Sequence, residues 1–312
     1  MKYFNSSILK SEASVTLWLT AAIFAASAEP IIVKLGYAAG VQPLQIFVLK
    51  NCFAAAVVLL LTRKFVWVGA KQLPRLALLA FLLFCTNGLI LLSLTMVPAV
   101  VVMTLVTTTP ALVAIINSAL GRDKLTAKFW SGFALCLAGV ILMLEVKSLT
   151  GHPLGILAVL AAVVTSSIYR VQMESACKAM NPLVVSSYQF PFNVFLCIPL
   201  MFFTPTIGAE ALKVGAIVGS AAALANIAFL SAMALIGSTR VSIISLLQRP
   251  LLLVLAIVVL NEPACALQLF GIVLTIVGVQ MAQVKRKHVP INIASEPDAE
   301  AEPVAAAAST RR

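Results

Sequence analysis

One pattern occurs twice in this sequence, as LSLTMVPAVVVMTLVTTTPALVAIINSALGRDKLTAKFWSGFALCLAGVILM (residues 92–143) and as LSAMALIGSTRVSIISLLQRPLLLVLAIVVLNEPACALQLFGIVLTIVGVQM (residues 230–281). Landmarks recur along the chain at an offset of 139 or 140 residues, namely Pro43-Leu44 with Pro182-Leu183, Pro110 with Pro250, Gly132 with Gly271, and Gly139 with Gly278. The chain therefore contains two copies of one structural unit.

The composition assigns both copies to a membrane. The 312 residues are 61% hydrophobic and 11% charged, with a mean hydropathy of +1.05, whereas soluble domains hold about 25% charged residues. A formal net charge of +11 would suggest nucleic acid in a soluble chain, but membrane proteins collect basic residues in their cytoplasmic loops. The sequence predicts an integral membrane protein in a lipid bilayer, with no nucleic-acid partner.

Apolar runs of about 20 residues, the length that crosses the hydrocarbon core, can be separated at Gly, Pro and charge clusters. Ten helices are predicted, near residues 15–37, 43–62, 75–96, 99–119, 127–146, 153–172, 182–204, 212–236, 239–260 and 266–284. Five fall in each copy, residues 15–146 and 153–284, and because five is odd the second copy crosses in the opposite direction. The predicted fold class is an all-α membrane protein with ten transmembrane helices in two inverted five-helix repeats.

The basic residues orient these helices. If the N-terminal residues 1–14 are cytoplasmic, only Lys147 and Lys213 lie outside, whereas fifteen fall inside: Lys2, Lys10, Arg63, Lys64, Lys71, Arg75, Arg122, Lys124, Lys128, Arg170, Lys178, Arg240, Lys285, Arg286 and Lys287. The positive-inside rule therefore predicts that both termini are cytoplasmic. Residues 285–312, rich in Ala, Pro and Glu after the last basic cluster, are predicted to be a disordered tail.

The stretch FAASAEPIIVK (residues 24–34) has a competing interpretation. Ala26-Ser27-Ala28 follows an apolar run and matches the small-x-small pattern of a signal-peptidase site. Cleavage after Ala28 would leave nine spans, remove the five-plus-five match and reverse the charge bias of every later loop. We therefore expect one continuous first helix with Glu29 inside it.

No pattern in the chain is typical of catalysis or of a cofactor. There is no Gly-rich phosphate loop, no Ser/His/Asp arrangement and no cluster of metal ligands, so ATP-driven pumping and hydrolysis have no support. The six cysteines form no C-x-x-C pair, which favours small buried side chains over disulfides or metal. We expect neither an enzyme nor a bound cofactor or metal.

The two repeated stretches resemble the last three helices of the EamA repeat in the drug/metabolite transporter superfamily. PLQIFVLKNCFAA (residues 43–55) resembles the second helix of that repeat with its basic residue, and SSIYRVQMESACKAMNPLVVSSYQF (residues 166–190) resembles the start of its second copy. The resemblance extends over residues 15–284. It implies a ten-helix inner-membrane carrier of small organic solutes, most often an exporter of amino acids, their derivatives or toxic metabolites.

Two departures from the family pattern concern the substrate. The acidic residue that often follows the fourth helix is Glu262 in the second copy, but the first copy has Asp123 in GRDKL. The tryptophan common in the first helix is missing from its usual place, and the nearest is Trp18. A particular substrate is therefore not carried over from the family.

Charges inside the predicted spans are functional candidates, because each costs about 3 kcal/mol or more at the bilayer centre. They are Glu29, Lys34, Lys50 and Arg249. Glu29 either faces the central cavity, where it pairs with a cationic substrate group or carries a proton, or forms a structural ion pair with Lys50 or Arg249. Lys34 lies near the outer end and can extend to the headgroups.

Lys50 has Gln189 at its equivalent position in the second copy, so the two form a matched polar pair of cavity candidates. Arg249 lies in the middle of the ninth span and needs a carboxylate, a carbonyl or an anionic substrate, because its guanidinium stays charged. Neutral binding candidates, with interhelical hydrogen bonding as the alternative role, are Asn87, Tyr188, Asn193, Asn226 and Gln248, and Trp18 and Phe190 are candidates for a stacking wall. The candidate hinges are Pro30, Pro110, Pro191 and Pro250.

The sequence thus predicts a secondary active transporter that exports a small organic metabolite by alternating access, with protons as a candidate coupling ion. Charges of both signs inside the spans favour a zwitterion, and the excess of cations favours a solute with an anionic group, such as an amino acid or a nucleoside derivative. The alternatives are an importer of a metabolite such as a nucleoside derivative or vitamin, and a membrane protein without transport activity, either a membrane-bound enzyme or an interaction partner. One continuous polar cavity that reaches either face would favour transport, whereas a core packed solid with lipid-like side chains would favour a structural protein.

Overall fold

The computed structural model describes residues 23, 27–29, 31–33, 35–62, 67–70, 72–94, 96–97, 99–143, 152–204, 206–260 and 265–282. These residues form helices joined by turns and loops, and they include no strand. The predicted all-helical class is therefore confirmed. Several residues and segments of the sequence analysis lie outside the described residues: 1–14, Trp18, Pro30, Lys34, Glu262 and the tail 285–312.

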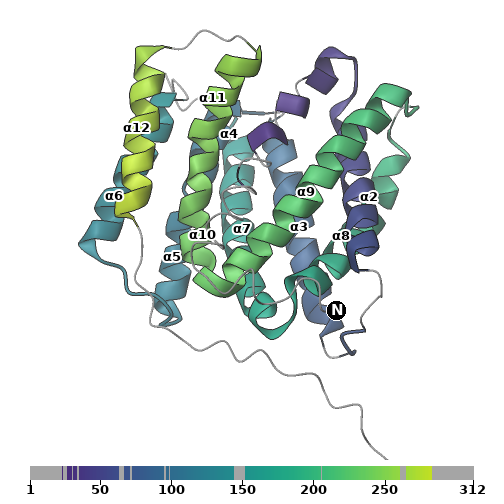
Figure 1. Ribbon diagram of the computed structural model, residues 1–312, viewed down its shortest axis with the longest axis horizontal. Coiled ribbons are helices and arrows are strands. Elements are labelled where there is room, and N and C mark those ends of the chain that lie inside the picture. Colours follow the sequence, from purple (N-terminus) through teal and green to yellow (C-terminus); the bar gives the residue numbers. More distant parts are fainter. Residues whose placement is uncertain are drawn as a thin grey trace, which may run out of the picture.

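The helices follow the two copies of the sequence pattern (Figure 1). In the first copy, helical residues between 27 and 38 are followed by α2 (Pro43–Thr62), α3 (Leu73–Leu94), α4 (Ala99–Val106), α5 (Thr109–Ala119) and α6 (Ala127–Met143). The second copy contains α7 (Pro153–Ala179), α8 (Pro182–Met201), α9 (Ala209–Ile236), α10 (Ser238–Ile244), the 3₁₀ turn η1 (Ser245–Leu247), α11 (Gln248–Leu260) and α12 (Ala266–Met281).

Seven segments among the described residues are long and apolar enough to cross a membrane, since a span needs about 20 residues at 1.5 Å per residue. They are Pro43–Thr62, Leu73–Ile90, Val101–Ala119, Pro153–Ala179, Pro182–Met201, Ala209–Ile236 and Ser238–Leu255. Helices α6 and α12 are apolar but shorter. The predicted first span is described only in part, so these nine helical segments correspond to the predicted second to tenth spans.

The structure corrects the predicted end of one span and the predicted continuity of two others. The sixth span was predicted to end at residue 172, but α7 continues to Ala179. Glu174 therefore lies inside the helix, and Arg170, counted among the cytoplasmic basic residues, lies more than two turns before its end. The fourth and ninth spans, predicted as single helices, are both interrupted: α4 and α5 are separate helices, and η1 lies between α10 and α11. Both interruptions lie a few residues before a proline, Pro110 or Pro250, so they occupy equivalent places in the two copies.

Glycines bring the helices of the two copies into direct contact. An added Cβ at Gly139 of α6 would lie 2.7 Å from the Gly271 carbonyl oxygen of α12, and one at Gly278 of α12 would lie 2.5 Å from the Cys136 nitrogen of α6. On α9, a Cβ at Gly219 would lie 2.7 Å from the Lys50 carbonyl oxygen of α2. Because backbone atoms occupy these positions, larger side chains would force the helices apart.

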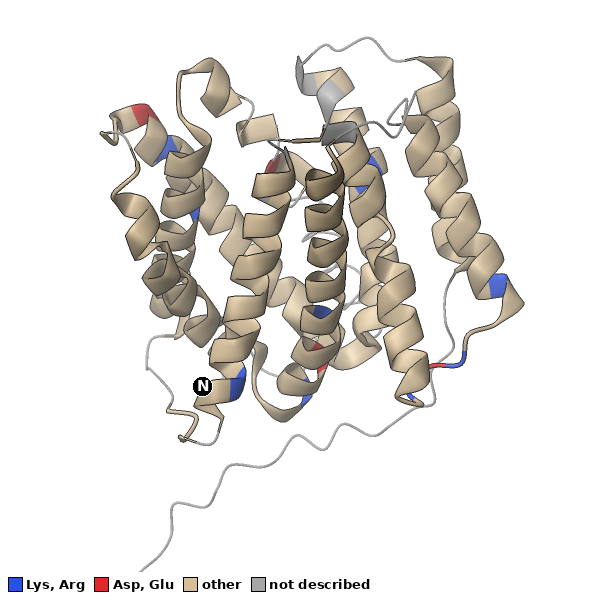
Figure 2. Cartoon of the chain, turned by 180° about the vertical axis from the view of Figure 1, so that it is seen from behind, with Lys and Arg blue, Asp and Glu red and all other residues tan. Residues whose placement is uncertain are grey.

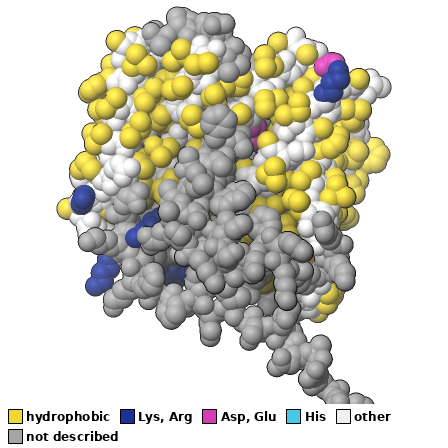
Figure 3. Space-filling view, viewed as in Figure 1, with side chains coloured by type: hydrophobic (Ala, Val, Ile, Leu, Met, Phe, Trp, Pro, Cys, Tyr) yellow, Lys and Arg dark blue, Asp and Glu magenta, His cyan; other side chains and the backbone are white. Residues whose placement is uncertain are grey.

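The outer surface is apolar over the described residues of the face drawn in Figure 3. Large hydrophobic side chains are exposed on several helices, for example Leu60 on α2, Leu157 on α7, Phe195 on α8 and Phe270 on α12. A soluble protein rarely exposes apolar area on this scale, whereas lipid tails solvate it. Figure 2 shows that the described Lys and Arg positions gather mainly toward the lower ends of the helices in that view.

Candidate functional site

A small polar cavity lies where the interrupted helices of both copies meet. Its volume is about 80 Å³, room for several water molecules at about 15 Å³ each. We call it the arginine cavity, and its lining residues are Val106, Thr107, Thr109, Pro110, Ser166, Arg170, Ser245, Leu246, Gln248 and Arg249. The first copy contributes the end of α4 and the start of α5, whereas the second contributes α7, η1 and the start of α11.

The interruption between α4 and α5 follows from its local sequence, TTTP. Pro110 has no N–H group to donate to the carbonyl of Val106, and the Thr109 hydroxyl donates to that carbonyl instead, at 2.7 Å. The hydroxyls of Thr107 and Thr108 donate in the same way to the carbonyls of α4 at 2.8 and 2.6 Å. The hydroxyls thus satisfy carbonyl groups of a helix end that lies inside the protein.

The second interruption uses a 3₁₀ turn in place of a row of hydroxyls. Ser245 begins the turn and donates to the carbonyl of Ser242 at 2.7 Å, and Pro250 follows in the first turn of α11. The Ser27 hydroxyl of the first helix lies 3.3 Å from the carbonyl oxygen of Gln248 and donates to it. The first helix therefore packs beside this interruption.

The two arginines of the cavity have no carboxylate partner among the described residues. Arg170 donates to the Ser242 hydroxyl at 3.2 Å. Arg249 donates to the thioether sulfur of Met103 at 3.2 Å, and a thioether is a weak acceptor. Because a guanidinium stays charged in proteins, the cavity contains two positive charges that these contacts do not neutralise.

Glu29 and Lys50, both predicted site residues, form an ion pair. The Lys50 ammonium donates to the Glu29 carboxylate at 2.5 Å, and the side chains are 32% and 27% exposed. Of the partners that the sequence left open for Glu29, the structure therefore has Lys50 and not Arg249. The pair neutralises both charges, yet its partial exposure leaves it within reach of water or solute.

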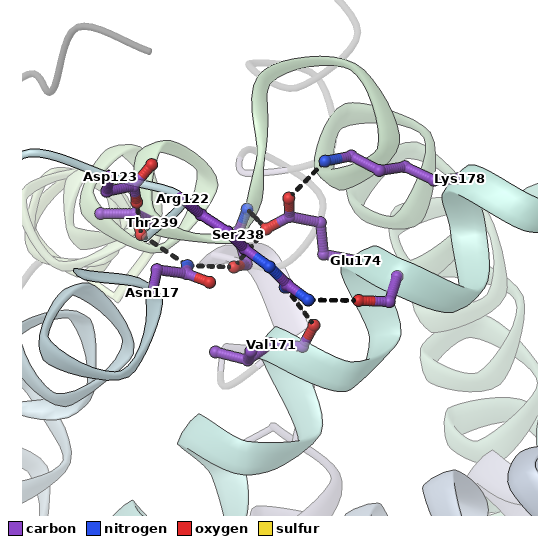
Figure 4. Close-up of polar contacts among 9 residues, drawn as sticks. Asn117, Arg122, Asp123, Val171, Glu174, Lys178, Ser238 and Thr239 are labelled. Atoms are coloured by element: carbon purple, nitrogen blue, oxygen red, sulfur yellow. Dashed lines mark hydrogen bonds and ion pairs between the residues drawn. The ribbon is translucent and has the colours of Figure 1, made fainter. Parts of the chain in front are cut away.

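A second polar cluster lies at the end of the helices where α5, α7 and α10 meet (Figure 4). We call it the polar bridge, and it consists of Asn117, Asp123, Glu174, Lys178, Ser238 and Thr239. The Glu174 carboxylate is fully buried and accepts hydrogen bonds from the Ser238 N–H at 2.7 Å, the Ser238 hydroxyl at 2.6 Å and the Lys178 ammonium at 2.7 Å. It thereby caps the N-terminus of α10, whose entry requires Gly237 at a φ of 85°.

The remaining members connect this cap to the first copy. The Asn117 amide donates to the hydroxyls of Ser238 and Thr239, both at 2.8 Å, and the Thr239 hydroxyl donates to the Asp123 carboxylate at 2.5 Å. Asn117 and Asp123 belong to the first copy and the others to the second. The bridge therefore joins the two copies through buried hydrogen bonds.

The other predicted residues lie away from the arginine cavity. Gln189 is buried and donates to the Tyr169 hydroxyl at 2.9 Å, Asn226 donates to the Ser186 hydroxyl at 3.3 Å, and Asn87 is exposed on α3. Buried acceptor oxygens of Gln189 and Asn193 have no partner among the described residues. Gln248 and Arg249 are the predicted binding residues that line the arginine cavity, with the predicted hinge Pro110.

Tyr188 and Phe190 are packed into the helix core. Tyr188 is 7% exposed, and its hydroxyl lies 3.3 Å from the Val68 N–H group, from which it accepts. Phe190 is 6% exposed and packs in a cluster with α2 and α9 side chains. Of the remaining predicted hinges, Pro191 lies inside α8 and Pro250 in α11.

Sequence reasoning missed three polar residues of α7: Ser166 and Arg170 of the cavity and Glu174 of the bridge. A signal for them exists, because Ser166, Arg170, Glu174 and Lys178 follow one another at intervals of four residues. Side chains four apart are neighbours on one face of a helix. The pattern is evident only once the helix is known to continue to Ala179.

The fold and the cavity define an all-α membrane protein of two repeats whose interrupted helices meet at a polar cavity. A sequence model described as the EamA-like transporter family matches residues 13–145 and 153–282. The chain therefore belongs to the EamA-like transporter family, which is consistent with the drug/metabolite transporter superfamily. The family indicates a membrane transporter, and its members are transporters rather than enzymes.

A solved structure titled "Crystal structure of protein" has a similar fold. Its TM-score is 0.74 over 87% of this chain and 97% of that chain, with 20% sequence identity. At this identity the likeness concerns the fold alone. Among curated proteins, none matches the sequence significantly.

Proposed function

We propose that the protein is a secondary transporter that moves a small organic metabolite by alternating access, with the arginine cavity as part of its substrate site. The observation that carries this proposal is the lining of the cavity by equivalent interruptions of both copies. Inverted-repeat carriers bind their substrate between the repeats, where discontinuous helices supply polar groups. A purely structural membrane protein has no need for two interrupted helices around an unneutralised charge.

The transport cycle requires this cavity to open further. Its volume of about 80 Å³ is well below the roughly 300–1,000 Å³ of typical small-molecule sites. The interruptions before Pro110 and Pro250 remove helical hydrogen bonds at the cavity, so movement of α5 and α11 about these points would widen it. Pro30 and Pro191 are further proposed hinges, and the polar bridge would separate and re-form as the two copies rock.

The proposed location is the inner membrane, with both termini in the cytoplasm. The distribution of Lys and Arg supports this orientation, because basic residues mark cytoplasmic loops. The α5–α6, α7–α8 and α9–α10 connections, and with them the polar bridge, would then face the cytoplasm. We propose export of an amino acid, an amino-acid derivative or a related solute, and the family resemblance favours this direction.

Glu29 and Lys50 are the proposed coupling pair. Protonation of the carboxylate would release Lys50, and the partial exposure of both side chains gives a proton access to them. Transport by a Glu29→Gln variant, measured in proteoliposomes across a pH series, tests this role. We expect slow transport without the pH dependence of the unaltered protein, whereas an unchanged rate and pH profile in a well-folded variant would exclude it.

The transport proposal itself is tested by counterflow in proteoliposomes with a panel of labelled amino acids and nucleosides. We expect at least one solute to exchange, and we expect the exchange to stop when Ser166, which lines the cavity, is replaced by Phe. The matched control is Ile168→Phe on the same helix, since Ile168 is 39% exposed. Equal exchange by both variants would contradict the cavity as the site, and no exchange beyond empty vesicles for any solute would contradict transport.

A further inference from the structure

Two arginines inside the described spans differ in their partners from three lysines of the described helices. Lys50, Lys178 and Lys213 each lie within 2.7 Å of a carboxylate oxygen, from Glu29, Glu174 and Glu210 respectively. Arg170 and Arg249 have no such partner among the described residues, although both lie in spans, where an unpaired charge is most unfavourable. Both arginines line the same cavity.

The acceptors that the protein supplies use only part of the hydrogen-bonding capacity of these two guanidiniums. Each guanidinium has five N–H donors in a planar fork, yet Arg170 donates to one hydroxyl and Arg249 to one thioether. Beside them, the Ser166 hydroxyl also lines the cavity. The cavity therefore contains an excess of donors and of positive charge.

We propose that Arg170 and Arg249 together bind one anionic group, a carboxylate or a phosphate, of the transported solute. Such groups accept two parallel hydrogen bonds from a guanidinium, which fixes their orientation. The cavity has room for a group of this size but not for a whole metabolite, so the rest of the solute lies in the space that opens during transport. This proposal rests on the proposed function and names the substrate class of the same site.

Only the second copy supplies an arginine to the cavity. The bound anionic group would therefore lie to one side of the axis that relates the two copies. The residue 139 before Arg170 is Ile31, and the residue 140 before Arg249 is Thr109. Both charges therefore belong to the second copy, while the first copy contributes neutral hydroxyls and Pro110. The solute is held in one orientation, with its anionic group against α7 and α11.

Two measurements on the full chain test the proposal. The first is thermal unfolding in detergent with inorganic phosphate, succinate, or the neutral succinamide as probe. The second is proteoliposome transport of solute pairs that differ by one anionic group: L-leucine and L-leucinamide for a carboxylate, uridine monophosphate and uridine for a phosphate. We expect one anionic probe to stabilise the protein and the matching anionic solute to be transported in preference to its neutral partner.

The variants are Arg170→Gln, Arg249→Gln and the charge-conserving Arg249→Lys, with Lys213→Gln as the control for loss of a cation outside the cavity. Loss of a hydrogen bond to a charged group weakens binding roughly 10- to 100-fold, so we expect the Gln variants to raise KM by that factor. Arg249→Lys should recover part of the loss, since it keeps the charge without the fork. Lys213→Gln should leave KM unchanged.

Failure of this inference differs from failure of transport. Equal transport of both members of each pair, together with no stabilisation by either anion, would overturn the anion subsite and leave the carrier function intact. Unchanged KM in well-folded Gln variants would overturn it as well. Stabilisation by an anion that the Gln variants abolish would support the subsite even if no solute of the panel crossed the membrane.

Discussion

Helix α7 has two pairs of polar residues on one face, and their surroundings differ. Glu174 and Lys178 belong to the polar bridge, where the carboxylate accepts three hydrogen bonds. Ser166 and Arg170, two turns earlier, line the arginine cavity, where the guanidinium has no carboxylate among the described residues. A buried polar group with all its partners stabilises one arrangement of helices, whereas one without partners is available to a ligand.

The largest expected effect on stability is at Glu174. Replacement by Ala leaves the Ser238 N–H and hydroxyl without their acceptor, which should lower the free energy of unfolding by about 3 kcal/mol. Lys178 is 41% exposed and contributes little to this loss. Chemical unfolding in detergent measures it. Glu174→Gln keeps an acceptor oxygen and should lose about half as much, and an Ala variant as stable as the original would refute the structural role of the bridge.

Asn117 should show a smaller loss from the same cluster. The Ala variant removes two hydrogen bonds at 2.8 Å to Ser238 and Thr239, but it also removes an amide oxygen that has no partner among the described residues. We expect a decrease of about 1–2 kcal/mol in the free energy of unfolding. Asn87→Ala, at an exposed position, is the matched control and should change little. Equal losses at both positions would show that burial in the bridge is irrelevant.

In the arginine cavity, removing a charged side chain should not lower the free energy of unfolding, in contrast to the polar bridge. Arg249→Leu removes a half-buried charge that has no carboxylate partner among the described residues, so we expect the free energy of unfolding to stay the same or to rise by about 1 kcal/mol, while transport is lost. Lys50→Leu is the comparison, because it leaves Glu29 without its partner and should destabilise the protein. Thermal unfolding and transport are measured on the same preparations. A marked loss of stability in Arg249→Leu would make this arginine structural.

The smallest effect is expected for an exposed ion pair that belongs neither to the polar bridge nor to the arginine cavity. Lys213 and Glu210 lie 2.7 Å apart on α9, and their side chains are 68% and 58% exposed. Exposed ion pairs contribute about 0–1 kcal/mol, so Lys213→Gln should change neither unfolding nor transport within error. A clear effect in either measurement would indicate a role of this helix end that its geometry does not explain.

Much of the fold was predictable from the sequence. The paired prolines and glycines identify the repeat, and the lengths of the apolar runs identify the described helices, since both depend on local composition. The predicted spans 99–119 and 239–260 correspond to Val101–Ala119 and Ser238–Leu255. Their irregular turns were not predicted, because a proline in a membrane helix is compatible with either a kink or an interruption. Three threonine hydroxyls stabilise the interruption in the fourth span, and a 3₁₀ turn forms the one in the ninth.

The site was predictable only in part. Arg249 and Gln248 stood out because a charge and an amide occurred in an apolar run beside a proline. Arg170 was counted among the cytoplasmic basic residues because it lies two residues before the predicted end of the sixth span, whereas α7 continues to Ala179. Its position on the cavity depends on the packing of α7 against α5 and α10, which periodicity along one helix does not specify.

The sequence by itself determined the all-helical membrane class, the two copies and the family, because hydrophobic length and repeated landmarks are properties of the chain read in one dimension. Tertiary structure alone decided which charges are neutralised. Glu29 pairs with Lys50 across 21 positions of sequence, and Glu174 reaches Ser238 across 64. Whether a buried charge has a partner depends on distances of a few ångströms between helices, and only packing fixes those distances.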